Sequence, residues 1–405
     1  MDLNKISSSP SRRNARAQVG LLALGHAVTD AYAAFLSPLW PILVAKLGIS
    51  MSLVGLSTSV MNVSASFMQP LYGYWADRTR RRIFVVAGPG ISAFFMCLIG
   101  IVPSYAALIA AIALAGVGVA AFHPQAATSV GTGSYRRKGL ALSVFITGGA
   151  VGYAAGPLIA SSFSARYGLE NLYLLAFPGV LTSLTLYLFM AAPPLRPVPV
   201  GLAGVFRDLR PRLKPLSALY AMSALRSAST IGLVTFLPFL LRERGLSLVE
   251  GGGMVSLFLL AGSVGGMVGG TLSDRIDRRT LLSGSLAAAT PLLMAMNAID
   301  HVGLSFATFL ALASFTLAFS NPVNVILAQE LIPNSVNTAS ALMIGSSWGT
   351  GGLIAATFGL FADAYGVPAL LRGIAFVPAG AALLGLILFR RQVAQTVDSQ
   401  TFKRA

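Results

Sequence analysis

Polar side chains that could move protons or bind solutes are rare in the apolar stretches of this 405-residue chain. His26, Asp30 and Ser37 fall within about 40 degrees of one another on an ideal helix, so they share one face. Burial and a neighbouring histidine both change how readily a carboxyl group holds a proton. Asp30, with His26 one turn away, is therefore predicted to take up and release a proton. The alternative interpretation is a hydrogen bond between helices that only stabilises the fold.

Two further polar stripes are expected to line a water-filled cavity. Each covers about 100 degrees or less of a helix surface. A guanidinium deep in an apolar stretch needs an anionic substrate, an acidic partner or a group of carbonyls. Arg226 is accordingly predicted to bind substrate, and a structural pair with Asp30 is the alternative. The stripes consist of Ser59, Asn62, Ser66 and Gln69, and of Ser223, Arg226, Ser227 and Thr230.

His123 immediately precedes Pro124, and a proline removes a backbone donor and kinks a helix. The freed backbone groups could serve a cavity, so His123 is predicted to lie on the substrate path. A kink with a hydrogen-bonded histidine is the alternative. Glu330 is expected to contact another helix or the membrane interface. The predicted substrate-binding residues are Arg226, Asn62, Gln69, His123, Tyr32, Asn321 and Trp348.

The sequence lacks two common motifs of nucleotide and metal chemistry. It has no GxxxxGK[ST] phosphate loop and no histidine pair at metal-ligand spacing. The three histidines fall in different apolar stretches or loops, and a metal site built from them would lack a second ligand nearby in sequence. We therefore expect no enzyme, no cofactor and no metal site, with an intramembrane enzyme as the weaker alternative.

Composition places the chain in a membrane. Hydrophobic residues make up 55% of it and charged residues only 10%, whereas soluble chains carry about 25% charged residues. The net charge of +16 comes from Lys and Arg spread over short loops, so binding to nucleic acid is not expected. The single cysteine, Cys97, can form no disulfide within the chain.

Twelve apolar stretches are long enough to cross a bilayer as helices, which takes about 20 residues each. They lack the strict alternation of barrel strands. We predict an all-α membrane protein with twelve transmembrane helices in two six-helix pseudo-repeats. The stretches cover residues 18–47, 53–76, 83–102, 105–130, 139–165 and 171–192, then 216–241, 248–272, 280–299, 303–330, 337–362 and 368–390.

A charged phrase that occurs twice relates the two halves. Gly73-Tyr74-Trp75-Ala76-Asp77-Arg78 and Gly270-Thr271-Leu272-Ser273-Asp274-Arg275 place their aspartates 197 positions apart. The same offset aligns Pro41 with Pro238, and Gly148 and Gly152 with Gly345 and Gly349. The predicted organisation is a tail at 1–17, a bundle at 18–192, a linker at 193–215, a bundle at 216–390 and a tail at 391–405.

The repeated phrases lie where helices leave the bilayer. A carboxylate there can pair with arginines or cap the N-terminus of a helix. We predict that the phrases act as a conformational latch, whereas an anchor that only sets topology is the alternative. The predicted latch residues are Gly73, Asp77, Arg78, Arg81, Gly270, Asp274 and Arg275.

The positions of the cations predict the orientation, because positively charged loops stay in the cytoplasm. Most Lys and Arg fall in the segments that share a side with the N-terminus. The segment 331–336 should lie on that side but carries no cation. Both termini are expected in the cytoplasm. The expected cations on the opposite side are Lys46, Arg166, Arg242, Arg244 and Arg372.

Twelve spans in two halves, with the phrase Gly73-x-x-x-Asp77-Arg78-x-Arg80-Arg81, resemble the major facilitator superfamily over nearly the whole chain. The resemblance implies a substrate cavity between two six-helix halves that rock to alternate access. The run Gly148-x-x-x-Gly152-x-x-x-Gly156-Pro157 is similar to the glycine-proline signature of drug-proton antiporters, which implies export and close helix packing. The second phrase departs from the latch pattern, since Asp277 stands among Arg275, Arg278 and Arg279.

A closer resemblance is to the fosmidomycin-resistance group of that superfamily. This resemblance implies proton-driven efflux of a small anionic phosphonate antibiotic. It would give Arg226 an anionic partner, although that role for Arg226 is inferred from its position alone. The phrases that carry the resemblance are Gly25-His26-Ala27-Val28-Thr29-Asp30, Gln69-Pro70-Leu71-Tyr72-Gly73-Tyr74-Trp75, Ala121-Phe122-His123-Pro124-Gln125-Ala126 and Ala328-Gln329-Glu330-Leu331-Ile332-Pro333.

The sequence thus predicts a monomeric, proton-coupled antiporter of the bacterial inner membrane that exports a small anionic or amphipathic compound. Asp30 and His26 would handle the proton. A proton-coupled importer of a sugar, an organic anion or another nutrient is the first alternative. A lipid flippase and a non-transporting sensor or scaffold are the others, because superfamily signatures do not choose the solute.

Overall fold

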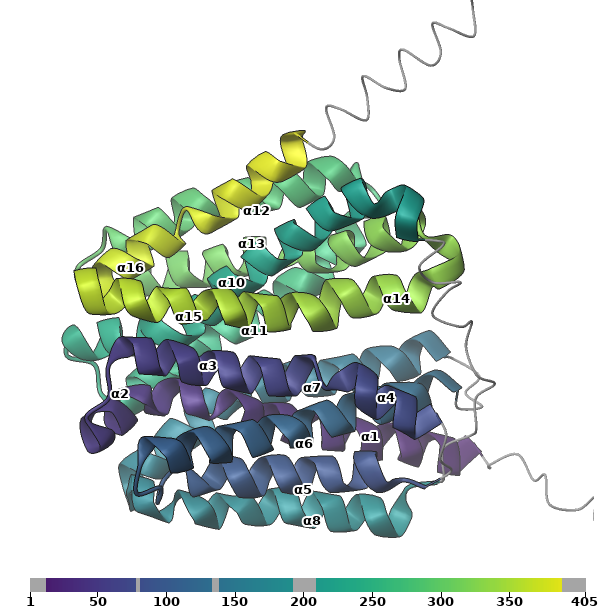
Figure 1. The fold of residues 1–405 in the computed structure, drawn as a ribbon, viewed down its shortest axis with the longest axis horizontal. Helices are drawn as coiled ribbons and strands as arrows, with labels where there is room; N and C mark the ends of the chain where they lie inside the picture. Colours follow the sequence, from purple (N-terminus) through teal and green to yellow (C-terminus); the bar gives the residue numbers. More distant parts are fainter. Residues whose placement is uncertain (1–11, 78–80, 133–137, 192–208, 388–405) are drawn as a thin grey trace, which may run out of the picture. The chain divides into compact units, whose positions relative to one another are not determined.

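The computed structural model describes residues 12–77, 81–132, 138–191 and 209–387. Helices account for most of these residues, and the described ranges contain no strand (Figure 1). The prediction of an all-α fold is confirmed for this part of the chain.

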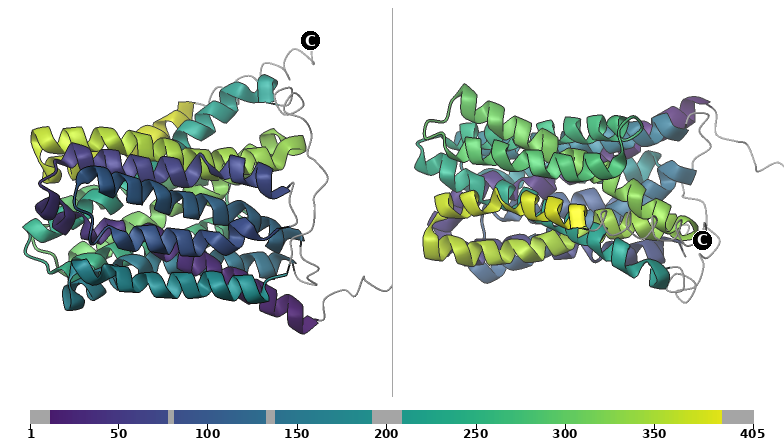
Figure 2. Two further views of the ribbon diagram at one scale, coloured as in Figure 1. Left: turned by 60° about the horizontal axis from the view of Figure 1, so that its bottom comes forward. Right: turned by 90° about the horizontal axis from the view of Figure 1, so that it is seen from above.

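The described chain divides into two compact units. The first comprises the residues up to Leu39 and from Val60 to 191, and the second comprises Trp40–Ser59 and the residues from 209 onward. The helices of the first unit run alongside one another (Figures 1 and 2). They are α1 (Arg12–Ala34), α4 (Gln69–Asp77), α5 (Ile83–Leu98), α6 (Tyr105–Thr132), α7 (Lys138–Tyr167) and α8 (Ala176–Phe189), with the 3-10 helix η2 (Leu169–Leu175) before α8.

The second unit has a similar series of helices. Its part from residue 209 onward begins with the 3-10 turn η3 (Arg210–Arg212) and ends with a helical segment at 377–387. Between these lie α10 (Leu213–Glu243), α11 (Leu248–Leu272), α12 (Arg278–Asn297), α13 (Leu304–Leu331), the turn η4 (Pro333–Ser335), α14 (Val336–Ser340), the π-helix η5 (Ala341–Ser346), α15 (Ser347–Tyr365) and α16 (Val367–Ile374).

Two helices near the start of the chain, α2 (Leu36–Leu47) and α3 (Met51–Ser66), supply the residues that join the second unit. Asp363 at the end of α15 accepts hydrogen bonds from the backbone amides of Met51 and Ser52, at 2.8 and 2.9 Å. Ser59 donates to the carbonyl of Gly352 at 2.5 Å. The two bonds to Asp363 satisfy the first amides of α3, which have no partner within their own helix.

Prolines explain why the first two predicted spans are each divided into two helices. In an α-helix, each backbone N–H donates to the carbonyl four residues earlier, and proline has no N–H. Pro38 therefore cannot bond the carbonyl of Ala34, where α1 ends, and Pro70 cannot bond the carbonyl of Ser66, where α3 ends. Each span consequently continues after a short interruption rather than stopping.

Nine helical segments of the described chain are long and apolar enough to cross a membrane. Helical residues also occupy the other three predicted spans, but α5 has only 16 residues, α12 is less apolar, and the span from 337 is interrupted by η5. The count of twelve crossings therefore remains a prediction. Large apolar side chains face outward along α8, where Phe177 is 69% exposed, as expected for a lipid-facing helix.

The two halves reuse the same turn chemistry. Gly48 follows α2 with φ +62 and Gly245 follows α10 with φ +84, and the two positions differ by the offset of the sequence repeat. Left-handed backbone at the end of a helix is accessible to glycine without steric cost. The internal repeat predicted from the charged phrases is thus visible in the backbone.

Close approach between α1 and α7 depends on the glycines of α7. A Cβ added to Gly148, Gly152 or Gly156 would lie 2.6, 1.9 or 2.3 Å from a backbone carbonyl oxygen of α1. Those oxygens belong to Ala23, Ala27 and Ala31, so small residues face small residues at every turn. This packing fixes α1, which carries His26 and Asp30, against the neighbouring helix.

Candidate functional site

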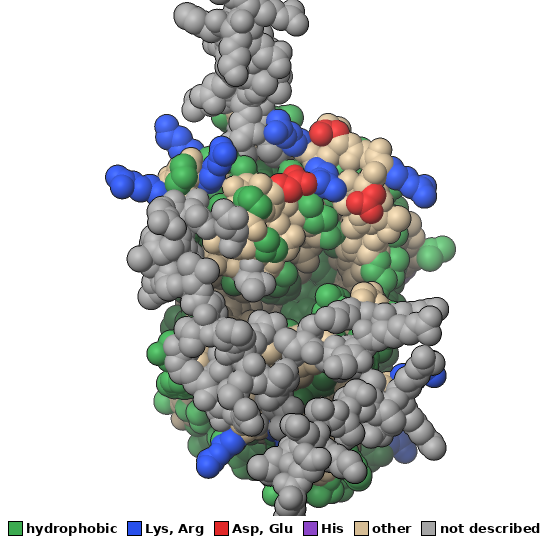
Figure 3. All heavy atoms as spheres, turned by 90° about the vertical axis from the view of Figure 1, so that its right-hand side faces the viewer, with side chains coloured by type: hydrophobic (Ala, Val, Ile, Leu, Met, Phe, Trp, Pro, Cys, Tyr) green, Lys and Arg blue, Asp and Glu red, His purple; other side chains and the backbone are tan. Residues whose placement is uncertain are grey.

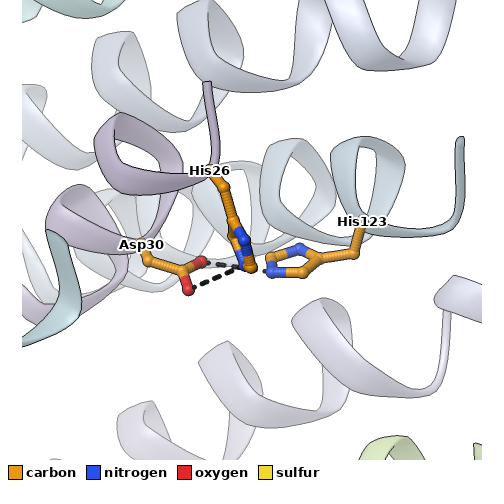
Figure 4. A group of neighbouring side chains, drawn as sticks. All are labelled: His26, Asp30 and His123. Carbon is orange, nitrogen blue, oxygen red and sulfur yellow. Dashed lines mark ion pairs between the residues drawn. The ribbon is translucent and has the colours of Figure 1, made fainter. Parts of the chain in front are cut away.

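Three ionisable side chains of the first unit converge inside its helices. His26 and Asp30 lie one turn apart on α1, and His123 comes from α6 (Figure 4). The Nε2 atom of His26 lies 3.2 Å from Asp30 Oδ2, and the Nε2 atom of His123 lies 3.2 Å from Asp30 Oδ1. We call these three residues the His–Asp–His cluster.

Backbone carbonyls orient both imidazole rings. His26 Nδ1 lies 2.9 Å from the carbonyl oxygen of Phe145 on α7, and His123 Nδ1 lies 2.8 Å from that of Val119 on its own helix. A carbonyl oxygen can only accept, so each Nδ1 carries a hydrogen and donates it. Each Nε2 atom faces Asp30.

Packing holds His26 in this position. Its ring stacks on Phe145 with the ring centroids 4.2 Å apart, and it meets the ring of His123 edge-on at 5.0 Å. A Cβ added to Gly149 would lie 2.4 Å from His26 Nε2. Glycine at this position of α7 therefore provides the space that the imidazole occupies.

The cluster is buried but not sealed. The exposed fractions of the side chains are 11% for His26, 18% for Asp30 and 24% for His123. Tyr153 of α7 also lies within electrostatic range of Asp30. A proton or another small ion can thus reach these atoms, while the low polarity around them strengthens any charge interaction.

The geometry calls for a cation. An imidazole that donates from Nδ1 and carries no second hydrogen has a lone pair at Nε2. That lone pair would oppose the carboxylate oxygen 3.2 Å away. Each contact is therefore attractive only when a proton or another positive ion lies between nitrogen and oxygen.

In the second unit, Arg226 of α10 is 4% exposed and lies over the ring of Trp348 on α15, with 5.9 Å between its guanidinium carbon and the ring centroid. It donates to Ser227 Oγ at 2.8 Å. Among the described residues of this unit, no Asp or Glu lies within ion-pair distance of the guanidinium. The structure thus brings two predicted substrate-binding residues, Arg226 and Trp348, together on a cationic and aromatic surface.

Polar side chains of α10 that precede Arg226 bond to neighbouring helices. Ser223 donates to Ser347 at 3.0 Å and to the carbonyl of Met343 at 2.9 Å. Tyr220 lies 2.6 Å from the hydroxyl of Thr350. These bonds connect α10 to the π-helix η5 and to α15, and a π-helix is often found at functional sites.

The other predicted substrate residues come from α1, α3, α4 and α13. Tyr32 is buried on the far side of α1, where it donates to the carbonyl of Leu175 at 2.5 Å. Gln69 donates to Ala65 of the preceding turn at 2.9 Å. Asn62 on α3 and Asn321 on α13 are half-buried.

The predicted latch is described only in part. Asp77 ends α4 but its side chain lies outside the described residues, as does Arg78. A Cβ on Gly73 would lie 3.5 Å from Pro124, and one on Gly270 would lie 3.7 Å from Pro322, so both glycines face a proline of a neighbouring helix.

Charged side chains gather at the end of the second unit that holds its latch phrase (Figure 3). Asp274 lies 3.8 Å from Arg278, which also forms an ion pair with Glu330 on α13. The expected contact of Glu330 with another helix is confirmed. Asp277 caps α12 by accepting from the backbone amide of Thr280 at 2.8 Å, while Arg275 is exposed beside this network.

Sequence reasoning missed two features of the first unit. Gln125, 1% exposed, accepts from the amide of Val85 at 2.9 Å and donates to the carbonyl of Arg81 at 3.0 Å, so it joins the start of α5 to α6. It also missed that His123 contacts Asp30, because residues far apart in sequence can be neighbours when their helices pack together. The only signal was the phrase Ala121-Phe122-His123-Pro124-Gln125-Ala126, in which His123 and Gln125 flank a proline.

Comparison with known proteins identifies the family. A model of the Major Facilitator Superfamily matches residues 22–356. The fosmidomycin resistance protein of Escherichia coli (strain K12) is 27% identical over 392 residues, which cover 94% of each chain. The multidrug resistance protein MdtG of Yersinia enterocolitica is 25% identical over 312 residues, which cover 72% of this chain and 73% of the relative.

A solved structure agrees with this result. A bacterial homologue of the human lysosomal transporter Spinster, in an inward-facing and unoccupied conformation, superimposes with a TM-score of 0.77 at 18% identity and covers 94% of this chain and 96% of its own. At that identity, the similarity is evidence for the fold alone. Since the family model spans most of the sequence and the helical fold agrees with it, the chain belongs to the Major Facilitator Superfamily of membrane transporters and is not an enzyme.

Proposed function

We propose that this transporter is a proton-coupled antiporter that exports a small anionic or amphipathic compound. The observation that carries the proposal is the convergence of His26 and His123 on Asp30. Imidazole changes its charge in the physiological pH range, and a carboxylate partner and burial adjust where that change occurs. Asp30, the two histidines and Tyr153 are the titratable groups that face one another there.

Proton binding would act on the conformation through the contacts within the cluster. With protons on Nε2, both histidines hold Asp30 by charge-assisted hydrogen bonds between α1 and α6. Without them, lone pairs oppose the carboxylate and the same arrangement loses stability. A ligand that binds one conformation better than another shifts the equilibrium between them, and here that ligand is the proton.

Arg226 and Trp348 are proposed to receive the solute. A buried guanidinium binds anionic oxygens, and the indole face suits the apolar part of an amphipathic compound. The names of two relatives, a fosmidomycin resistance protein and a multidrug resistance protein, support efflux as the direction. Asn62, Gln69, Asn321 and Tyr32 remain proposed as further contacts.

The proposed setting is the bacterial inner membrane, with a monomeric chain and both termini in the cytoplasm. The distribution of Lys and Arg over the loops supports this orientation. The proposed domains keep the boundaries predicted from the sequence, with bundles at 18–192 and 216–390. The glycine-proline run of α7 and the two latch phrases are proposed to guide the change between conformations.

The experiment is transport in proteoliposomes with fosmidomycin as the probe and an imposed proton gradient. Wild-type protein should move the compound in one direction across the membrane while protons move in the other. The Asp30→Asn variant should lose gradient-driven transport but keep binding of the compound, measured by thermal stabilisation of the purified protein. Wild-type coupling in Asp30→Asn would remove Asp30 from the proton role.

The same vesicles separate the alternative functions. Movement of solute and proton in the same direction would identify an importer, and a panel of sugars, organic anions and nucleosides would then replace fosmidomycin. Redistribution of labelled lipid between leaflets would identify a flippase. Absence of solute flux across the panel, despite a folded protein, would support a sensor or scaffold.

A further inference from the structure

The His–Asp–His cluster also has the composition of a metal site. We propose that His26, Asp30 and His123 bind one divalent transition-metal ion of the Zn²⁺ class, with the two Nε2 atoms and the Asp30 carboxylate as ligands. The candidate ligand atoms all lie within 4.8 Å of one another. The proposal concerns binding of a metal and stands whether or not the chain couples transport to protons.

Ligand spacing supports a tetrahedral ion. Zn²⁺ forms bonds of about 2.0–2.2 Å to nitrogen and oxygen, and a tetrahedron of that size places its ligand atoms about 3.3 Å apart. His26 Nε2 lies 3.2 Å from Asp30 Oδ2, and His123 Nε2 lies 3.2 Å from Asp30 Oδ1, so each histidine has this spacing to a different carboxylate oxygen. To surround a single ion, the carboxylate must bind through both oxygens or turn to share one of them, and the two histidines must draw closer together.

The hydrogen bonds outside the cluster are those that metal-binding histidines use. A ligating histidine usually donates its other ring N–H to a carbonyl or carboxylate, which fixes the ring and leaves a lone pair toward the metal. His26 does so to Phe145 and His123 does so to Val119. Both rings are therefore held with Nε2 toward the ion before any ion arrives.

Charge and access favour the same conclusion. The three ligands together carry one negative charge when both histidines are neutral, and a divalent ion would stabilise the lone pairs that otherwise oppose the carboxylate. His123 is 24% exposed and Asp30 is 18% exposed, so water would be available as the fourth ligand of a tetrahedral ion. Imidazole nitrogen also selects Zn²⁺ over Mg²⁺, which prefers oxygen ligands.

The test is metal binding to tag-free, full-length protein in detergent. Calorimetry with ZnCl₂ should give one site per chain, and MgCl₂ should give none. His123→Asn and Asp30→Asn should each weaken Zn²⁺ binding by about 100-fold or more, because loss of an outer partner alone costs about 10–100-fold. The matched control is His301→Asn, which removes the third histidine of the chain and should bind Zn²⁺ as the wild type does.

A second measurement needs no variant. X-ray absorption at the zinc edge of the wild-type complex should show scattering from two imidazole rings. Binding should also release protons and weaken as the pH falls, since the ligands must give up their protons. Absence of a site, equal binding by His123→Asn and wild type, loss of binding in His301→Asn, or fewer than two imidazoles at the metal would each overturn the proposal.

Discussion

At the scale of single residues, the position of His26 depends on a glycine of another helix. Replacing Gly149 by alanine would place a Cβ 2.4 Å from His26 Nε2, so the imidazole ring must shift and its contact with Asp30 is expected to lengthen. Loss of one charge-assisted hydrogen bond costs about 1.5–3 kcal/mol. We therefore expect Gly149→Ala to weaken proton-driven transport by about tenfold or more, measured as the initial rate in proteoliposomes at a fixed gradient.

The control for this variant lies on the same helix. Gly139 has open space where a Cβ would be placed, so Gly139→Ala should transport as the wild type does. Equal rates for Gly149→Ala and Gly139→Ala would mean that the contact between His26 and Asp30 does not limit coupling.

A different prediction concerns Arg226, which lies over the ring of Trp348. Replacing it by lysine keeps the positive charge but removes the planar guanidinium. A planar guanidinium can donate two parallel hydrogen bonds to an anionic group, and loss of one charge-assisted bond costs about 1.5–3 kcal/mol. Arg226→Lys should therefore bind fosmidomycin at least about tenfold more weakly, as measured by the concentration needed for thermal stabilisation. Arg166→Lys, which alters a similar stack on Tyr167 at an exposed position, should leave that concentration unchanged.

The sequence predicted part of this chemistry. The spacing of His26 and Asp30 places them on one helical face, so their pairing follows from local periodicity. The approach of His123 depends on how α6 packs against α1, which no local pattern encodes. Pro124 marked the place, but the direction of the neighbouring imidazole is a property of tertiary structure.

At the scale of helices, Asp274 of the second latch phrase and Asp277, which follows that phrase, have different local roles. Asp277 accepts from the amide of Thr280 and caps α12, whereas Asp274 is 76% exposed and makes a longer ion pair with Arg278. Loss of such a cap costs about 0.5–2 kcal/mol, while an exposed ion pair contributes about 0–1 kcal/mol. Asp277→Ala should thus lower the melting temperature in detergent more than Asp274→Ala does.

The pH dependence of this cap has a definite sign. Hydrogen bonds from Thr280, with a smaller contribution from the charge of Arg279, lower the pKa of Asp277 below the ordinary value for an aspartate. The stabilisation is therefore fully present above the ordinary pKa and is lost as the pH falls through the lowered one. The difference in melting temperature between wild type and Asp277→Ala should shrink on acidification, and a difference that grows would contradict the cap.

The ends of the helices could be predicted where the sequence changes from apolar to polar, but the interruptions within helices were harder to predict. The apolar stretches identified the helices within a few residues, because the limit of an apolar run is also the limit of burial in lipid. The interruptions at Phe35 and Phe67 follow from Pro38 and Pro70. The π-helix η5 leaves no comparable mark in the sequence, since it depends on how its neighbours pack.

At the scale of the whole molecule, orientation in the membrane can be tested with the chain's own chemistry. Cys97 is fully buried, so a membrane-impermeant maleimide should not label the wild type in intact cells. Ser104 and Arg275 are both exposed positions, predicted on opposite sides of the membrane. Because cationic loops stay in the cytoplasm, Ser104→Cys should label in intact cells and Arg275→Cys only after the cells are opened.

The comparison carries its own internal control, because each variant differs from the wild type by one surface residue and should label in opened cells. If Arg275→Cys but not Ser104→Cys is labelled in intact cells, the topology is the reverse of the one proposed and both termini lie outside. The gradient would still drive protons into the cell, but they would reach the cluster through the opposite face of the protein. The charge pattern of the loops, which sets the orientation, therefore also determines from which face of the protein a proton would reach the His–Asp–His cluster.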